Sequence, residues 1–378
     1  MTFPDPGLSP ATDPARREPL RVALIAGDGI GPELVDSAAR VLAAASQSVG
    51  EDVCFTEEPG GASTYEETGV AMPAEVLQRL RTCYDAVLKG PVGLPHVRHA
   101  DGTEAGLLGG IMRTGLDAFA NVRPMRLRPG VHTPVRHAPN DIDYVIVREN
   151  TEGLYLSRGL GVVTRDAVSD QLMLTRRGCA RICRYAFELA RQRHGAPGDG
   201  VRRVTCVDKS NVLRSYALFR EVFDDVAEAY PDIDTDHRYA DAAGHDLVAN
   251  PSHFDVIVTE NFLGDLLSDV GAATVGGLGM CPSGNIGDGV SYFEPTHGSA
   301  PGLAGQDRAN PLSQILSAAM LLHHCGRDRG AQVIERAVTD ALASGEMSLT
   351  PHQTPVGGTE QVTRTVLDRI NQTGGNAA

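Results

Sequence analysis

The sequence lacks several patterns that mark particular classes of protein. Its 378 residues include 34 lysines and arginines against 48 aspartates and glutamates, a formal net charge of −14. This balance argues against nucleic acid as a partner, because that affinity depends on cations that neutralise phosphates. The longest apolar runs fall far short of the roughly 20 residues that span a bilayer, and no charged-then-apolar leader opens the chain. We therefore expect a soluble, cytoplasmic protein.

The cysteines lack the spacing of a disulfide framework or a zinc site. There are seven, an odd number, and no two of them form a C-x-x-C pair. We expect reduced thiols that are mostly buried.

What the sequence does contain is an alternation of short apolar runs with helical patterns. The runs end near residues 26, 90, 150, 210 and 261, and apolar positions recur three or four apart between them. This alternation predicts an α/β fold, and the chain length predicts two domains. We predict helices over 32–47, 176–193 with Thr175 as N-cap, 215–229, 311–324 and 328–343.

Two segments stand apart from this alternation. Residues 1–19 are rich in proline and charge, which predicts disorder. Residues 155–171 have mixed β character without a core-facing period. We interpret the second segment as a protruding arm that pairs with another subunit.

The stretch ALIAGDGIGPELV, residues 23–35, places glycines between an apolar run and the start of a predicted helix. Gly27, Gly29 and Gly31 read G-x-G-x-G. A dinucleotide fingerprint needs G-x-G-x-x-G, so that the third glycine falls inside the helix against the strand. The usual fingerprint is therefore absent.

Two aspartates suggest a cation site. If 261–270 is helical, Asp265 and Asp269 are four residues apart on one face, where like charges repel unless a cation lies between them. Paired carboxylates suit Mg²⁺ or Mn²⁺, and a solvated acidic face is the alternative. Asp241 or Asp246, in a turn-like stretch, is a candidate third ligand or a plain surface acid.

Basic residues form a second set. Arg113, Arg123 and Arg148 are candidates for an anion clamp, and Arg148 ends an apolar run where a guanidinium group needs an anion. Ion pairs with structural acids are the alternative. Lys209 follows another apolar run. At such a position a lysine with a lowered pKa can act as a base, and the alternative is a side chain that simply reaches water.

The stretch YFEPTHGSAPGLAGQDRANP, residues 292–311, is too rich in small residues for a helix and too long for a simple turn. It offers donors from Thr296, His297, Ser299 and Asn310. Such a loop can wrap a nucleotide through its backbone, or be an ordinary glycine- and proline-rich connection.

Eight motifs occur in the order GDGIGPE, LKGPVG, R followed by FANVRP, VRENTEGLY, VDKSNV, ADAAGHDLV, GDLLSDVGA and EPTHGSAP. Together they resemble the β-decarboxylating dehydrogenases, the family of isocitrate, 3-isopropylmalate, homoisocitrate and tartrate dehydrogenases. The similarity runs from about residue 20 to 371. One such motif is weak, whereas eight in order are specific.

The resemblance implies an isopropylmalate dehydrogenase-like fold of two domains. A discontinuous large domain would contain residues 1–118 and 276–378, and a smaller domain residues 119–275, with the arm near 150–171. In the family the small domains pair in a homodimer. Lys209 and Asp241 would then reach the active site of the partner subunit.

The resemblance also implies roles for the candidate residues. Asp265, Asp269 and Asp241 of the partner subunit would hold Mg²⁺ or Mn²⁺, and Arg113, Arg123 and Arg148 would clamp the carboxylate that leaves. Lys209 would remove the C2 hydroxyl proton, and Tyr155 would protonate C3. The cofactor would contact Glu104, Asn211, Glu294, His297, Gly298, Ser299, Ala300, Pro301, Gly302 and Asn310.

The sequence departs from the family pattern at two places. Gly302 stands where NAD-dependent members have aspartate and NADP-dependent isocitrate dehydrogenases have lysine; the C-terminal GGTEQVTRTVL favours NAD, and NADP stays open. Gly109 and Gly110 precede Arg113, in the segment that distinguishes substrates within the family. We hypothesise a malate with a larger or more polar 3-substituent than isopropyl.

An anionic substituent such as phosphonomethyl would suit His96, Arg98 and His99 upstream, unless these are solvated loop residues. Oxidation of tartrate or D-malate is an alternative activity. A non-catalytic regulatory subunit of a hetero-oligomeric dehydrogenase is the alternative outside the enzymes.

Overall fold

A computed structural model describes residues 18–100, 102–157 and 161–375 of the chain. Most of the predicted disordered leader, residues 1–17, lies outside the described residues. The first strand begins at Leu20, where the apolar run LRVALI starts.

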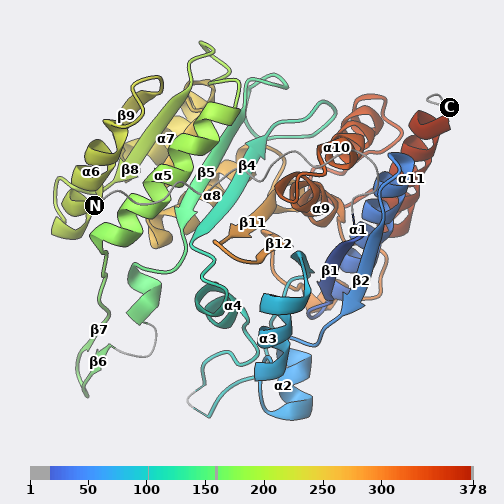
Figure 1. Ribbon diagram of the computed structural model, residues 1–378, viewed down its shortest axis with the longest axis horizontal. Helices are drawn as coiled ribbons and strands as arrows, with labels where there is room; N and C mark the ends of the chain where they lie inside the picture. Colours follow the sequence, from blue (N-terminus) through green and yellow to red (C-terminus); the bar gives the residue numbers. More distant parts are fainter. Residues whose placement is uncertain (1–17, 101, 158–160, 376–378) are drawn as a thin grey trace.

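The fold is built on one mixed sheet of ten strands in the order β2-β1-β3-β12-β11-β4-β5-β10-β8-β9 (Figure 1). The two ends of the sheet are parallel, and the pairs β12–β11, β11–β4 and β4–β5 in the middle are antiparallel. The strands are β1 (Leu20–Ile25), β2 (Val53–Glu57), β3 (Ala86–Lys89), β4 (Ala120–Arg126), β5 (Asp143–Glu149), β8 (Arg203–Asp208), β9 (Asp234–Tyr239), β10 (Val256–Thr259), β11 (Pro282–Ile286) and β12 (Ser291–Pro295).

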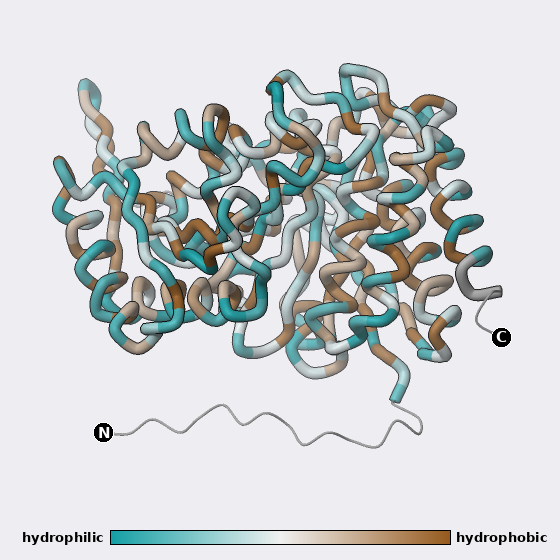
Figure 2. Tube along the Cα trace, turned by 90° about the horizontal axis from the view of Figure 1, so that it is seen from above, coloured by the Kyte–Doolittle hydropathy of each residue, from teal (hydrophilic) through white to brown (hydrophobic). Residues whose placement is uncertain are grey.

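Helices cover both faces of this sheet, so the buried strands are apolar on both sides. In β5, Val145 and Val147 face one core, whereas Tyr144 and Ile146 face another. The first core includes α1 (Gly31–Ser48), α5 (Arg176–Gln192), α6 (Arg214–Ala227), α9 (Leu312–His324), α10 (Asp328–Ala343) and α11 (Thr359–Gly375). The opposite face is covered by α3 (Ala74–Cys83), α4 (Gly109–Gly115), α7 (Ala240–Ala249) and α8 (Asn261–Thr274). Helix α2 (Ala62–Thr68) packs in a small separate cluster with Val97 and Ala105. Hydrophobic and hydrophilic stretches alternate along many helices in Figure 2, as expected where one helix face is buried.

The structure confirms the α/β prediction and the five predicted helices, which correspond to α1, α5, α6, α9 and α10 within two residues at each end. Thr175 caps α5, because its side chain accepts a hydrogen bond from the backbone nitrogen of Gly178. All five apolar runs form strands, namely β1, β3, β5, β8 and β10.

One local prediction is wrong. Asp241 and Asp246 lie in helix α7, not in a turn. The stretch ADAAGHDLVA is rich in alanine, the best helix former, and it buries Ala243 and Leu247 four residues apart. These two features outweigh the helix-weakening effect of Gly244.

The arm predicted near 150–171 contains a short helical turn, η1 (Leu154–Ser157), and the hairpin of β6 (Val162–Val163) and β7 (Val168–Ser169). The hairpin stands away from the sheet (Figure 1). Val162, Val163 and Val168 are exposed there. Pairing of this arm with another subunit stays a prediction, as does the division into two domains.

All seven cysteines are free thiols, and four of them are buried, as expected. Within the described residues, no helix combines the length and the apolar character that crossing a membrane requires.

Candidate active site

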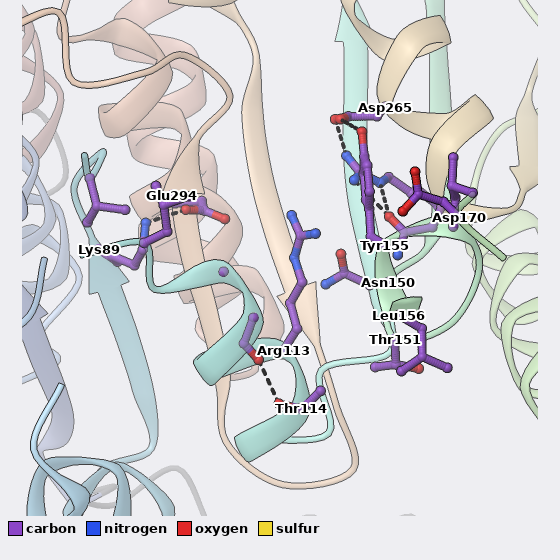
Figure 3. Close-up of a pocket in the computed structure, with 17 residues that line it drawn as sticks. Lys89, Arg113, Thr114, Asn150, Thr151, Tyr155, Leu156, Asp170, Asp265 and Glu294 are labelled. Atoms are coloured by element: carbon purple, nitrogen blue, oxygen red, sulfur yellow. Dashed lines mark hydrogen bonds and ion pairs between the residues drawn. The ribbon is translucent and has the colours of Figure 1, made fainter. Parts of the chain in front are cut away.

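A cavity of about 750 Å³ lies beside the middle of the sheet (Figure 3). The carboxyl ends of β3 and β5 point towards it, the edge at which open α/β sheets bind ligands. Lys89 is the last residue of β3, and Arg148 precedes the last residue of β5. The remaining lining residues are Val92, Leu107, Gly109, Gly110, Arg113, Thr114, Asn150, Thr151, Leu154, Tyr155, Leu156, Asp170, Asn261, Asp265 and Glu294.

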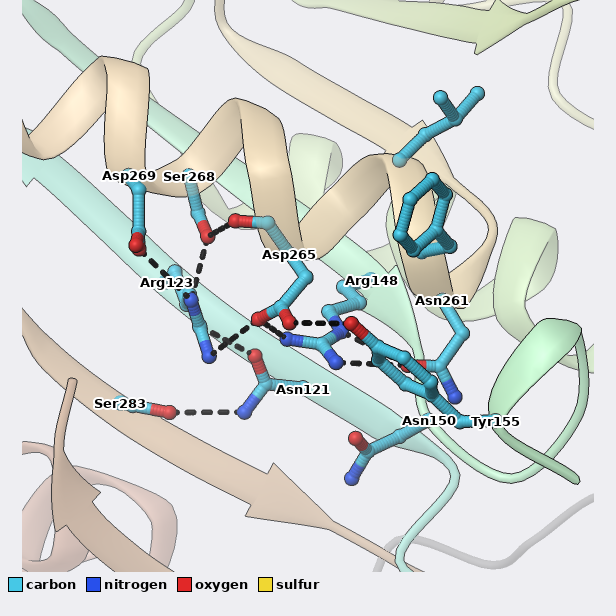
Figure 4. A network of polar contacts seen from close by, with 12 residues as sticks. Asn121, Arg123, Arg148, Asn150, Tyr155, Asn261, Asp265, Ser268, Asp269 and Ser283 are labelled. Carbon is cyan, nitrogen blue, oxygen red and sulfur yellow. Dashed lines mark hydrogen bonds and ion pairs between the residues drawn. The ribbon is translucent and has the colours of Figure 1, made fainter. Parts of the chain in front are cut away.

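The centre of the polar network is the carboxylate of Asp265 on α8 (Figure 4). Arg148 Nη1 contacts its Oδ1, and Arg123 Nη2 lies 3.6 Å from the same oxygen. Tyr155 Oη donates a hydrogen bond of 2.9 Å to Oδ2. Burial alone would raise the pKa of Asp265, but the charges of Arg148 and Arg123 outweigh it, so the pKa of this carboxyl is lowered. The side chain is therefore an anion held between two cations.

Asp269 lies one helical turn beyond Asp265, as the spacing predicted. Its Oδ1 is 3.8 Å from Arg123 Nη1, and its side chain is 60% exposed. Burial and the nearby charge of Asp265 raise the pKa of Asp269, although Arg123 opposes them. A second cation beside Asp269 would relieve the repulsion between its carboxylate and that of Asp265. The two carboxylates therefore fit a hard divalent ion that takes oxygen ligands.

No group of three or more histidine, cysteine, aspartate or glutamate side chains converges on a possible metal position among the described residues. Asp241, the predicted third ligand, is instead paired with Lys209 at 2.6 Å, and neither residue lines the cavity. Lys209 follows β8 and Asp241 is in the first turn of α7. One copy of the chain thus brings two of the three predicted carboxylates together.

Two of the three predicted arginines, Arg113 and Arg148, line the cavity, and Arg123 contacts the lining residue Asp265 from beside it. Arg148 is almost fully buried, and its Nε donates to Asn261 Oδ1 at 3.0 Å. Arg123 donates from Nε to Asn121 Oδ1 at 2.7 Å. Arg113 reaches the cavity from α4, and its Nε is buried without a partner.

Glu294 is the one predicted cofactor residue that lines the cavity. It pairs with Lys89 at 2.5 Å and accepts a hydrogen bond from Asn285 Nδ2 at 2.9 Å. Burial raises its pKa, but Lys89 more than offsets this, so the pKa of Glu294 is lowered. Glu104 contacts Arg98 away from the cavity, and the exposed Asn211 does not line it either.

The loop after β12 carries the other predicted cofactor residues, which are His297, Gly298, Ser299, Ala300, Pro301, Gly302 and Asn310. The His297 ring has a buried Nε2 without a partner, and burial lowers its pKa. Ala300 adopts a left-handed conformation with φ of 36°. A side chain added at Gly302 would meet nothing within 4 Å. The loop thus leaves an unpaired ring nitrogen and open space, as a site for a bound group requires.

The glycine-rich turn is a junction between chain segments. Asp28 Oδ2 accepts hydrogen bonds from the backbone nitrogens of Ala62 and Gly93 at 2.8 and 2.7 Å. A Cβ at Gly29 would lie 2.1 Å from the carbonyl oxygen of Ser299, and the Ile30 nitrogen already donates to that oxygen at 2.9 Å. The turn therefore packs against the loop after β12 instead of offering its amides to a phosphate.

The upstream cations do not reach the cavity. His96 pairs with Glu66 at 3.3 Å, Arg98 with Glu104 at 3.4 Å, and His99 contacts Tyr65. None of the three lines the cavity.

Sequence reasoning missed Lys89, Asn121, Asn150 and Asn261, all of which join the polar network. The available signal was their position, since each lies in a strand or within two residues of the end of one. Polar side chains at such buried strand ends need partners.

Comparison with known proteins gives a consistent result. The family model described as isocitrate/isopropylmalate dehydrogenase matches residues 21–366. A 3-isopropylmalate dehydrogenase from Oleidesulfovibrio alaskensis is 41% identical over 339 residues, which is 86% of this chain and 92% of the relative. A 3-isopropylmalate/3-methylmalate dehydrogenase from Methanocaldococcus jannaschii is 41% identical with the same coverage. The crystal structure of isocitrate dehydrogenase from Methylococcus capsulatus superposes with a TM-score of 0.82 at 35% identity, covering 93% of this chain and 100% of that one. The chain belongs to the isocitrate/isopropylmalate dehydrogenase family.

Proposed function

We propose that the protein oxidises a 3-substituted malate with NAD and releases CO₂, with a divalent metal ion in the site. The observation that carries this proposal is the convergence of Arg123, Arg148 and Tyr155 on the carboxylate of Asp265 beside a cavity. The similarity to 3-isopropylmalate dehydrogenases supports the same reaction class.

The arginines bind the carboxylate that leaves as CO₂. Guanidinium groups match the planar fork of a carboxylate, and Arg148, whose Nε and Nη2 donate to Asn261, lines the cavity. Arg113 supplies a further positive charge from the opposite wall.

Asp265 and Asp269, with Asp241 of a second copy, would hold Mg²⁺ or Mn²⁺. The bound ion would supply positive charge that stabilises the negative charge developing on a substrate oxygen. Tyr155 holds a proton for C3, because burial and the hydrogen bond to Asp265 raise its pKa. Lys209 of the second copy takes the proton from the C2 hydroxyl.

NAD would accept the hydride from C2, bound along the loop from His297 to Gly302. The open space at Gly302 neither repels nor neutralises a ribose phosphate, so NADP is tested beside NAD. Glu104 and Asn211 stay predictions as cofactor contacts, as does the cytoplasmic location.

A homodimer completes this site. The residues around Lys209 and along α8 expose apolar side chains, with Val212 67%, Leu213 47%, Leu266 53% and Val270 37% exposed. Contiguous exposed apolar side chains mark protein interfaces, and we propose that these two groups belong to one such surface. A second copy that covers this surface would carry its own Lys209 and Asp241 to it.

The lining of the cavity favours an apolar substituent at C3 that is larger than isopropyl. Val92, Leu107, Leu154 and Leu156 supply aliphatic walls. A Cβ at Gly110 would meet nothing within 4 Å, so this wall leaves space. The cations that would suit an anionic substituent contact other residues.

The test is a spectrophotometric panel with Mg²⁺ or Mn²⁺, NAD or NADP, and malates that carry isopropyl, larger alkyl, carboxymethyl or phosphonomethyl groups at C3, together with D-malate and tartrate. We expect NADH to form with an alkyl malate and to stop when the metal is chelated. Failure with every substrate would contradict the proposal and favour a regulatory subunit. NADH without CO₂ would favour tartrate or malate oxidation.

A further inference from the structure

The three arginines of the site differ in how their side chains are anchored. The Nε of Arg123 donates to Asn121 Oδ1 at 2.7 Å, and the Nε of Arg148 donates to Asn261 Oδ1 at 3.0 Å (Figure 4). Each of these arginines is thus fixed by an asparagine carbonyl oxygen. The Nε of Arg113 is buried and has no partner.

One asparagine of the same network has an unpaired acceptor that is complementary to this unpaired donor. Asn150 is 2% exposed and lines the cavity, and its Oδ1 is buried without a partner. Its Nδ2 donates to the carbonyl oxygen of Ala118 at 2.9 Å and to Asn285 Oδ1 at 3.0 Å. The amide orientation is therefore set by two acceptors, and the oxygen is the atom left unpaired.

The orientation of Asn285 confirms this direction. Its Nδ2 donates to the carboxylate of Glu294, so its Oδ1 must accept. Asn121 and Asn150 both donate to that oxygen, at 2.9 and 3.0 Å. The two asparagines are thus held alike, but only Asn121 has an arginine on its Oδ1.

We propose that Asn150 is a positioning residue for Arg113, and that its Oδ1 accepts a hydrogen bond from Arg113 Nε when substrate is bound. Both residues line the same cavity, Arg113 from α4 and Asn150 just after β5 (Figure 3). A buried donor without an acceptor and a buried acceptor without a donor are each unfavourable, and one contact satisfies both.

This contact would orient the part of Arg113 that binds substrate. With Nε held by Asn150, the two terminal nitrogens would face a carboxylate as a fixed fork. The inference rests on the proposed function, because it takes Arg113 to be a substrate ligand. Asn150 itself acts through Arg113.

The test is a double-mutant cycle on the full-length protein, read as the KM for the best 3-substituted malate, kcat, and the KM for NAD. Asn150→Ala is expected to raise the malate KM about tenfold, the cost of one lost hydrogen bond to a charged group, and to leave the KM for NAD unchanged. In an Arg113→Lys background, which has no Nε–H, adding Asn150→Ala is expected to change the malate KM less than twofold.

A matched control is Asn121→Ala, which acts through Arg123. Its effect is expected to have the same size in the wild-type and Arg113→Lys backgrounds. If Asn150→Ala likewise causes equal losses in both backgrounds, its role is structural and the inference is wrong.

A crystal structure of the wild type with bound malate gives a second measurement that needs no variant to fold. We expect Arg113 Nε within about 3.2 Å of Asn150 Oδ1. A clear separation of the two atoms would overturn the inference. Wild-type protein that neither binds nor oxidises any 3-substituted malate would overturn the proposed function as well.

Discussion

Replacing Asp28 by asparagine tests whether the glycine-rich turn is a structural junction. Asp28 is 1% exposed, and its carboxylate accepts four hydrogen bonds, from the Ala62, Ser63 and Gly93 nitrogens and from Ser63 Oγ. An amide keeps the shape but replaces one accepting oxygen by a donor. In the more favourable orientation its NH₂ group lies beside Ser63, whose hydroxyl can turn to accept, so only the Ser63 backbone nitrogen loses its acceptor. At about 1–3 kcal/mol for one buried unsatisfied group, the free energy of unfolding falls by about that amount.

The assay is urea unfolding followed by circular dichroism. Asp36→Asn on the same turn-and-helix segment is the matched control, because the Asp36 side chain is 66% exposed and makes only a 3.4 Å contact with Arg40. The control is expected to change stability by less than about 0.5 kcal/mol. Because Ser299 Oγ donates to the Gly93 carbonyl, Asp28→Asn is also expected to raise the KM for NAD. Equal stability of the two variants would refute the interpretation of the glycine-rich turn as a structural junction.

Three further predictions concern the subunit interface, the substituent pocket and the pH dependence of stability. Lys209→Ala and Asp265→Asn proteins are each expected to be inactive. A mixture refolded together is expected to regain about a quarter of wild-type activity, because about half of the dimers are mixed and one of the two sites in each mixed dimer is intact. No recovery would contradict a shared site. Gly110→Leu is expected to raise the KM for bulky 3-alkyl malates more than tenfold, because the new side chain fills open space in the cavity. The KM for D-malate is expected to stay within about twofold of the wild-type value. Equal changes in the two KM values would contradict the placement of the 3-substituent beside Gly110. Hydrogen bonds from Arg40 lower the pKa of Glu360 from 4.5 to about 2, so its contribution is present above pH 4.5 and is lost as the pH falls through 2. The stability difference between wild type and Glu360→Gln, at most about 1 kcal/mol for so exposed a pair, is expected to vanish over that range in acid titrations of unfolding, and a constant difference would refute the assignment.

The sequence predicted best those elements whose pattern is local. Helix α5 has a long apolar stripe and a threonine cap, and both its start and its end could be predicted from the sequence. The short helix α4 and the antiparallel strands β4, β11 and β12 depend on contacts between distant segments, and no local period reveals them. Helix α7 resembles a turn in the sequence, because its glycine and polar residues interrupt the alanine-rich pattern that favours a helix.

The site shows the same limit. Asp265 and Asp269 could be paired from a spacing of four, and the structure places them on one helix as predicted. Asn261 could not be assigned to Arg148 from the sequence, because the two residues lie 113 positions apart along the chain. The upstream cations His96 and Arg98 were candidates by charge alone, and their acidic neighbours Glu66 and Glu104 could be identified only in the fold.

The central claim is that oxidation and decarboxylation occur together at the Asp265 cavity. The most direct measurement is the ratio of NADH formed to CO₂ released by wild-type protein with Mg²⁺ and its best 3-substituted malate, repeated with Asp265→Asn. We expect equal amounts of the two products in the wild type and loss of both in the variant. NADH without CO₂ in the wild type, or an Asp265→Asn protein that keeps full activity, would contradict it.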